Sequence, residues 1–110
     1  MKWKAIALLF SGRQNPDWKL TVAQQKSWMK LWLQAPLSDT EAESVSKLGY
    51  TGCRLQYNEH SHWQLYNGFV SFYEKETVFS KKDEEKKMEL FLLGTAPEEV
   101  KGFLQEMKII

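Results

Sequence analysis

Residues 63–73 read WQLYNGFVSFY. Two runs rich in aromatic and aliphatic side chains, Trp63–Tyr66 and Phe69–Tyr73, flank the pair Asn67-Gly68. This pair best adopts the two positive φ angles of a type I′ turn, so the segment predicts a tight β-hairpin. One long strand bent at Gly68 is the alternative. Either arrangement places a meander of β-strands in this region.

Two further strands are expected upstream of the hairpin. Between residues 51 and 58 the side chains alternate in character, as in a half-buried antiparallel strand: Thr51, Cys53, Leu55 and Tyr57 against Gly52, Arg54, Gln56 and Asn58. Ala5–Phe10 is continuously apolar and short. That pattern is typical of a strand covered on both faces, so Ala5–Phe10 is expected near the middle of a sheet.

Helices are expected between and after these strands. Thr21 and Gln24 form a capping box that predicts a helix over residues 22–34, ended by Pro36. The apolar face of that helix is expected to hold Val22, Met29, Trp32 and Leu33, with Trp28 at its margin. Residues 38–48 have the spacing of a short second helix closed by Gly49.

The C-terminal third contains two more cap signals. Ser80 and Asp83 are spaced as a helix cap before a charged run that leads to Met88, although residues 88–93 also fit a buried strand. Thr95 and Glu98 form a third capping box, with Pro97 in the first turn. The helix that follows is expected to pack through four residues at i, i+3, i+4 and i+7: Val100, Phe103, Leu104 and Met107.

These elements predict an α+β fold over one domain, residues 1–110. The expected order is β-α-(α)-β-β-β-α-α, with a small, mainly antiparallel sheet and amphipathic helices on at least one face. If the helices cover only one face, the other exposes aromatic side chains of the meander, such as Tyr66 and Tyr73. If helices cover both faces, all of these aromatic side chains belong to the core. Exposed Tyr side chains are typical of protein interfaces.

Composition excludes several classes of protein. The chain has 15 Lys and Arg against 14 Asp and Glu, so its net charge gives no reason to expect nucleic acid as a partner. The meander aromatics resemble base-stacking platforms, but almost no arginine accompanies them. Cys53 is the only cysteine, which rules out an internal disulfide. No run approaches a membrane span, so a cytoplasmic protein that binds no membrane is expected.

The polar segment Ser11–Trp18 follows the first expected strand, where sheets often place ligands. Arg13 is suited to hold a carboxylate or phosphate, Asn15 and Asp17 to orient a polar ligand, and Trp18 to stack on it. In the alternative interpretation, Arg13 pairs with Asp17, Asn15 forms an Asx turn and Trp18 closes the end of the sheet.

The motif Ser-Gly-Arg-x-Asn-Pro-x-Trp-x-Leu at residues 11–20, with Leu-Gly-Tyr-x-Gly at residues 48–52, resembles a group of small bacterial proteins of unknown role. The resemblance covers about fifteen positions. It implies no activity, cofactor or catalytic residue, and it indicates only that the loop is a signature of the group.

No motif predicts catalysis or a cofactor. His60 and His62 lie on one side of an extended segment, but a protein metal site needs three or four ligands, and solvated turn histidines are expected. Cys53 is expected on the apolar face of its strand, where it has no activating partner. The chain contains neither GxxxxGK[ST] nor GxGxxG, so no glycine-rich phosphate-binding loop is predicted.

Elimination of these classes favours a small protein-recognition module of the inhibitor, immunity-protein or adaptor type, without catalytic activity. Its expected binding residues are Arg13, Asn15, Asp17, Trp18, Tyr66 and Tyr73. The alternative is a pocket protein or an enzyme that acts on a small anionic ligand. Arg13 would then anchor the ligand, Asp17 would serve as a base and Trp18 would form a wall.

Overall fold

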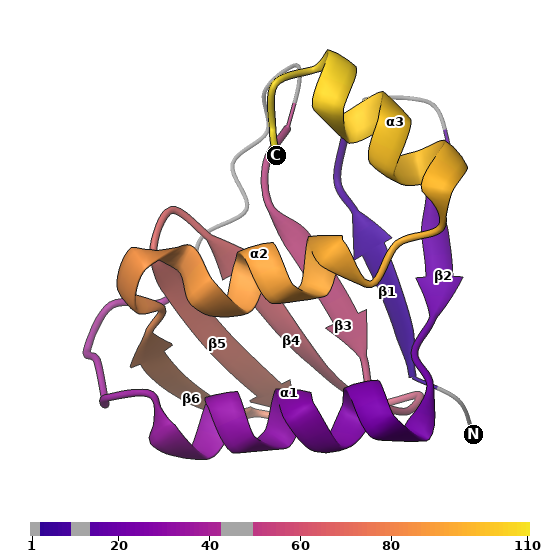
Figure 1. The fold of residues 1–110 in the computed structure, drawn as a ribbon. Coiled ribbons are helices and arrows are strands. Elements are labelled where there is room, and N and C mark those ends of the chain that lie inside the picture. The colour runs from indigo at the N-terminus through magenta and orange to yellow at the C-terminus, as the bar shows by residue number, and fades with distance from the viewer. Residues whose placement is uncertain (1–2, 10–13, 43–49) are drawn as a thin grey trace.

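The computed structural model describes residues 3–9, 14–42 and 50–110, which form one antiparallel sheet and three α-helices (Figure 1). The strands are β1 (Lys4–Ala7), β2 (Asp17–Lys19), β3 (Cys53–Gln56), β4 (Ser61–Tyr66), β5 (Phe69–Glu74) and β6 (Thr77–Lys82). They lie in the order β2-β1-β3-β4-β5-β6. The helices are α1 (Val22–Gln34), α2 (Lys87–Gly94) and α3 (Glu98–Glu106), with a short 3-10 turn, η1 (Glu84–Lys86), before α2. The predicted α+β class is confirmed.

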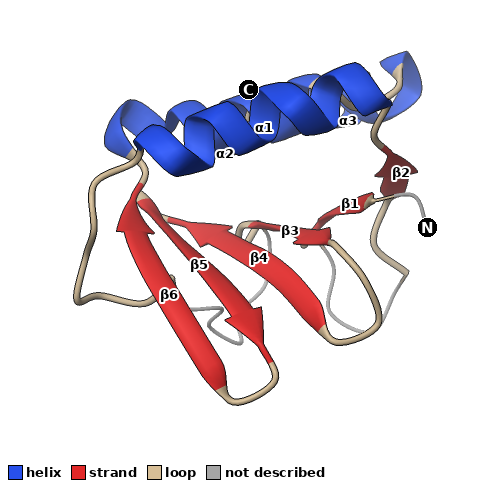
Figure 2. Ribbon diagram, turned by 90° about the horizontal axis from the view of Figure 1, so that it is seen from below, coloured by secondary structure: helices blue, strands red, loops and turns tan. Residues whose placement is uncertain are grey.

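All three helices lie on the same side of the sheet (Figure 2). Cross-strand partners share a face of a sheet, and the register aligns one residue from each of four strands: Ala5, Leu55, Trp63 and Phe72. This row faces the helices, because the Trp63 ring packs against Trp28 of α1 at 5.6 Å. Among the described residues, helices cover only the face of β1 that holds Ala5 and Ala7, so the predicted cover on both faces is not found in this part of the chain.

The capping box predicted at the start of α1 is present. Thr21 Oγ1 accepts from the Gln24 amide at 3.1 Å, and Gln24 Oε1 accepts from the Thr21 amide at 2.9 Å. The predicted apolar face is rotated from the observed one, because Trp28 is fully buried while Val22 and Leu33 are exposed. Trp28 faces the sheet because its indole fills the space above Trp63.

The predicted hairpin at Asn67-Gly68 is also present. Asn67 has φ 53° and Gly68 has φ 87°, and the strands on either side pair from Tyr66 with Phe69 onward. Two successive positive φ angles are characteristic of a type I′ turn. The alternative of one long bent strand is excluded.

The segment after the hairpin differs from the prediction. Ser80 does not cap a helix but lies in β6, where its hydroxyl is 2.9 Å from the Ser71 hydroxyl of β5. The cap is Asp83, whose carboxylate accepts from the amides of Met88 at 2.7 Å and Glu89 at 3.0 Å. The strand alternative for residues 88–93 is wrong, because they belong to α2.

Two other predicted helix boundaries are wrong. Residues 38–42 form no helix; the Ser38 amide instead donates to the Ser80 carbonyl, and the Lys82 amide donates to the Pro36 carbonyl along the outer edge of β6. The remainder of the predicted second helix, residues 43–48, lies outside the described residues. Thr95 ends α2 rather than capping α3, and α3 begins at Glu98.

Candidate functional site

The predicted loop site is largely used to build the fold. Arg13 lies outside the described residues. Asn15 Oδ1 accepts from the Leu9 amide at 2.8 Å and so joins the two sides of the loop. Asp17 is exposed at the start of β2, whereas Trp18 is buried and its indole nitrogen donates to Thr95 Oγ1 at 2.8 Å. Trp18 therefore offers no surface for stacking on a ligand.

Tyr66 and Tyr73 lie on the helix-free face of the sheet, but at opposite ends of the β4–β5 hairpin. The Tyr73 ring stacks on His62 at 5.0 Å, and its hydroxyl donates to Glu41 Oε2 at 3.3 Å. The Ala42 amide donates to Ser71 Oγ on the same face at 2.9 Å. Residues 41 and 42 therefore cover part of this face, and the structure does not bring the two tyrosines together.

Polar residues occupy the centre of the helix-free face. The Arg54 guanidinium donates to Gln64 Oε1 at 3.4 Å. Partial burial, reinforced by the positive charge of Arg54, lowers the pKa of His62. A lowered pKa keeps this imidazole neutral at pH 7, so His62 supports Tyr73 by stacking rather than by charge.

A second polar group is buried between α2 and β3. The Tyr50 hydroxyl donates to Glu89 Oε2 at 2.5 Å, and Glu89 is 5% exposed. Burial raises the pKa of the Glu89 carboxyl. Burial also raises the pKa of the fully buried Cys53 thiol, with a further increase from the charge of Glu89. A protonated, inaccessible thiol is a poor nucleophile, so this group supports no thiol chemistry.

The raised pKa of Glu89 predicts a pH-dependent effect of Glu89→Gln. A carboxyl group whose pKa is higher in the folded than in the unfolded protein stabilises the fold below the unfolded value, about 4.5, and loses that contribution as the pH rises. The Gln variant should therefore gain stability relative to wild type between pH 4 and pH 8, by about 1.4 kcal/mol per unit of pKa difference.

Urea unfolding at four pH values measures this difference, with the exposed Glu99→Gln as control. Asp83, whose pKa burial also raises, is present in both proteins, so it enters the difference only through its charge coupling to Glu89. The other charged or titratable groups around Glu89 are also present in both proteins: Tyr50, Cys53 and Lys86. A stability difference that stays constant with pH would contradict the prediction.

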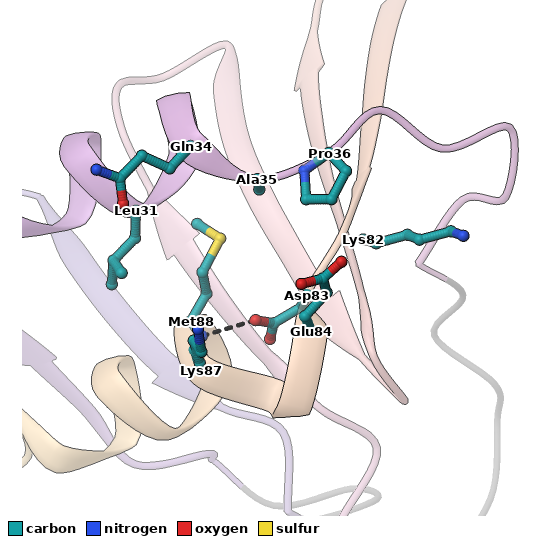
Figure 3. A pocket seen from close by; sticks show the side chains of 9 residues that line it. All are labelled: Leu31, Gln34, Ala35, Pro36, Lys82, Asp83, Glu84, Lys87 and Met88. Atoms are coloured by element: carbon teal, nitrogen blue, oxygen red, sulfur yellow. Dashed lines mark hydrogen bonds between the residues drawn. The ribbon is translucent and has the colours of Figure 1, made fainter.

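A small pocket of about 100 Å³ lies between the end of α1 and the start of α2 (Figure 3). Leu31, Ala35 and Met88 line it, with Lys82 and Lys87 also among its lining residues. The nearby Asp83 carboxylate is already bonded to the Met88 amide, as the dashed line in Figure 3 shows. The carboxylate serves to cap α2, and the pocket is too small for more than a few atoms.

A larger pocket, of about 340 Å³, lies between α1 and one end of the sheet. Five of its seven lining residues are aromatic, and we call it the aromatic pocket: Trp3, Met29, Trp32, Tyr57, Trp63, Phe72 and Glu74. Trp63 is 3% exposed and packs against the rings around it, with centroids 4.6 Å from Phe72 and 5.5 Å from Trp3. Tyr57 is 38% exposed and meets Trp3 edge-on at 5.0 Å.

Four parts of the chain bring these rings together. Met29 and Trp32 are three residues apart on α1, so they share a helix face. Trp63 and Phe72 are direct partners of β4 and β5. Lys4 pairs with Gln56 at one end of the β1–β3 ladder, and Trp3 and Tyr57 are the next residues outward. Their ring contact follows from that register.

Charged groups accompany the rings on two sides. The exposed Glu74 ends β5, and its Oε2 accepts from the hydroxyl of the buried Ser61 at 3.2 Å, which orients the carboxylate beside the rings. The Lys81 ammonium, from β6, lies 4.4 Å from the centre of a ring of Trp32 on α1 and donates to the Trp32 carbonyl at 2.6 Å. Lys81 does not line the aromatic pocket.

Sequence reasoning identified the crowding of aromatic residues in the meander, including Trp63 and Phe72, but missed the pocket. Trp3, Trp32 and Tyr57 come from other parts of the chain, and only the register of β1 with β3 and the rotation of α1 unite them. The period-two spacing of Leu55 and Tyr57 was a usable signal, since it places both side chains on one face.

No family model, curated protein or solved structure matches the chain. Within residues 3–9, 14–42 and 50–110, no three His, Cys, Asp or Glu side chains are grouped to hold a metal ion. In the same part of the chain, no helix has the length and apolar composition needed to cross a bilayer.

Proposed function

We propose that this protein is a recognition module that binds another protein through the aromatic pocket, as an inhibitor, immunity protein or adaptor does, and catalyses no reaction. The observation that carries the proposal is the open pocket lined by five aromatic side chains beside a carboxylate that Ser61 orients. Trp and Tyr dominate the energetics of protein interfaces because they bury much area with few rotatable bonds.

The arrangement of the rings favours binding energetically. They already pack against one another, with centroid separations of 4.6 to 6.4 Å, so a partner would not need to order them. Ordering a flexible side chain at an interface costs roughly 0.5–1.5 kcal/mol, and preorganised rings avoid most of this cost. The volume of the pocket, about 340 Å³, is also large enough to receive one large side chain of a partner.

The other predicted surfaces support the proposal less. Asn15 and Trp18 are engaged within the fold, and a small anionic ligand at Arg13 depends on a residue outside the described part of the chain. Tyr73 bonds Glu41 within the chain. The aromatic pocket therefore supports the function better than the Ser11–Trp18 loop.

A displayed peptide library tests this function. Peptides selected on the wild-type protein should lose at least about tenfold in affinity, or about 1.4 kcal/mol, for Trp3→Ala and Tyr57→Ala. Both residues are partly exposed, so the variants should fold, which circular dichroism checks. Dissociation constants are measured by tryptophan fluorescence.

The matched control is Leu33→Ala, which removes a 71% exposed apolar side chain from α1 without touching the pocket. It should leave peptide affinity unchanged. Selected peptides that bind Trp3→Ala and Tyr57→Ala as tightly as wild type would refute recognition through this pocket.

A further inference from the structure

Glu74 gives the aromatic pocket a negative charge. Within the described residues the only ion pair is Lys101 with Glu98 at 3.9 Å, so no Lys or Arg side chain of this part of the chain forms an ion pair with Glu74. One of its oxygens accepts from Ser61 Oγ, and a carboxylate can accept several further hydrogen bonds. The pocket thus combines aromatic surface with an anionic acceptor that Ser61 orients.

Aromatic rings attract cations over their faces because the ring quadrupole is negative there. The protein already contains one such contact, in which the Lys81 ammonium lies 4.4 Å from the centre of a Trp32 ring. Glu74 adds direct charge attraction on the side of Phe72. Both features favour a cationic side chain over a neutral apolar one.

We propose that the aromatic pocket receives an arginine side chain of the partner protein, with its guanidinium against the rings and its N–H groups donating to Glu74. This inference rests on the proposed function and names the ligand chemistry of the same site. Guanidinium is planar, weakly hydrated and suited to stacking on aromatic rings, and it pairs with carboxylates through two parallel hydrogen bonds.

Two other cations fit less well. A trimethylated lysine has no N–H to donate, so it would leave the Glu74 carboxylate without a hydrogen bond from the ligand. An unmodified lysine ammonium is strongly hydrated, so it loses more hydration free energy than a guanidinium when it enters an aromatic site. Arginine alone uses both the rings and the carboxylate, and it is enriched at the centres of protein interfaces.

The five tryptophans allow a direct test. Indole N–H resonances are followed by ¹H–¹⁵N NMR during titration with N-acetyl-arginine amide. The resonances of Trp3, Trp32 and Trp63, which line the pocket, should move. That of Trp18, whose indole donates to Thr95 just after α2, should not. Absence of movement at the pocket indoles, or equal movement at Trp18, would overturn the proposal.

Ligand and protein variants separate charge from shape. N-acetyl-citrulline amide has nearly the shape of the arginine probe without its charge, and it should bind about tenfold more weakly. Glu74→Gln should weaken arginine binding by a similar factor and leave citrulline unaffected. The control Glu76→Gln, an exposed carboxylate two residues later that does not line the pocket, should change neither.

The remaining outcomes distinguish this proposal from the proposed function. Equal binding of citrulline and arginine, or tighter binding of N-acetyl-trimethyl-lysine amide that survives Glu74→Gln, would overturn the arginine assignment. Selected peptides that depend on Trp3 and Tyr57 but contain no arginine would leave protein recognition standing and refute the arginine assignment alone. If N-acetyl-arginine amide binds but no selected peptide depends on Trp3 and Tyr57, the proposed recognition of a protein would be refuted and the arginine assignment would stand.

Discussion

Gly52→Ala is expected to destabilise the protein by about 4 kcal/mol or more, a loss reached only by severe backbone clashes or core defects. Gly52 has φ +105°, which side-chain-bearing residues rarely adopt. A Cβ at this position would overlap the Leu65 carbonyl oxygen and lie 3.0 Å from Tyr66 Cβ. The clash is with the β4 backbone, which cannot move away without breaking its pairing with β3.

Urea unfolding followed by circular dichroism measures this loss. Folded domains have about 5–15 kcal/mol of stability, so a loss of this size removes between about a quarter and most of it. The control is Gly102→Ala in α3, where an added Cβ meets nothing within 4 Å. It should stabilise the protein by up to about 1 kcal/mol. Equal effects of the two substitutions would contradict this account of Gly52.

Trp28→Ala should cost about 3–5 kcal/mol, the range for removing a large aromatic side chain from a core. Trp28 is fully buried between α1 and the sheet, with ring centroids 5.6 Å from Trp63 and 6.5 Å from Phe91. The cavity left behind would lie directly behind Trp63 of the aromatic pocket. Pocket binding should therefore weaken even in conditions where the variant is folded.

Thermal and urea unfolding give the stability change, and Leu33→Ala is again the matched control. Leu33 lies on the same helix but is 71% exposed, so its loss should change stability by no more than about 0.5 kcal/mol. A Trp28→Ala variant as stable as Leu33→Ala would show that α1 does not depend on this contact.

Local chemistry was sufficient to predict some elements correctly. The reciprocal Thr21–Gln24 cap satisfies backbone donors by itself, so α1 begins where the sequence indicates. Asn67-Gly68 determines its own turn geometry, which fixes the register of β4 with β5. In both cases the decisive interactions lie within four residues of one another.

Long-range contacts decided the elements that were predicted wrongly. Ser80 and Asp83 are both competent caps, and pairing with β5 draws Ser80 into a strand while Asp83 caps α2. Thr95 resembles the first residue of a capping box, but its hydroxyl accepts from the Trp18 indole 77 residues away. The spacing of residues in the sequence cannot show whether Thr95 caps the next helix or bonds a distant side chain.

The candidate site depends even more on distant contacts. Alternation left open whether Tyr66 and Tyr73 lie in the core or on an exposed face, and in the structure both lie on the helix-free face. The aromatic pocket, by contrast, joins residues from Trp3 to Glu74. Its existence depends on which strand lies beside β3 and on the rotation of α1, and neither is encoded in a short segment.

Residues 36–38 run along β6 and make part of this sheet edge unavailable for self-association. Exposed sheet edges invite a second chain to add a strand, which leads to aggregation. Here the Lys82 amide already donates to the Pro36 carbonyl, and the Ser80 carbonyl already accepts from the Ser38 amide. Pro36 has no N–H that could donate to a strand of a second chain. At the other edge β2 is three residues long, with charged Asp17 and Lys19 exposed. The paired Ser80–Lys82 half of β6 and the short, charged β2 therefore reduce the length of sheet edge that a second chain could extend.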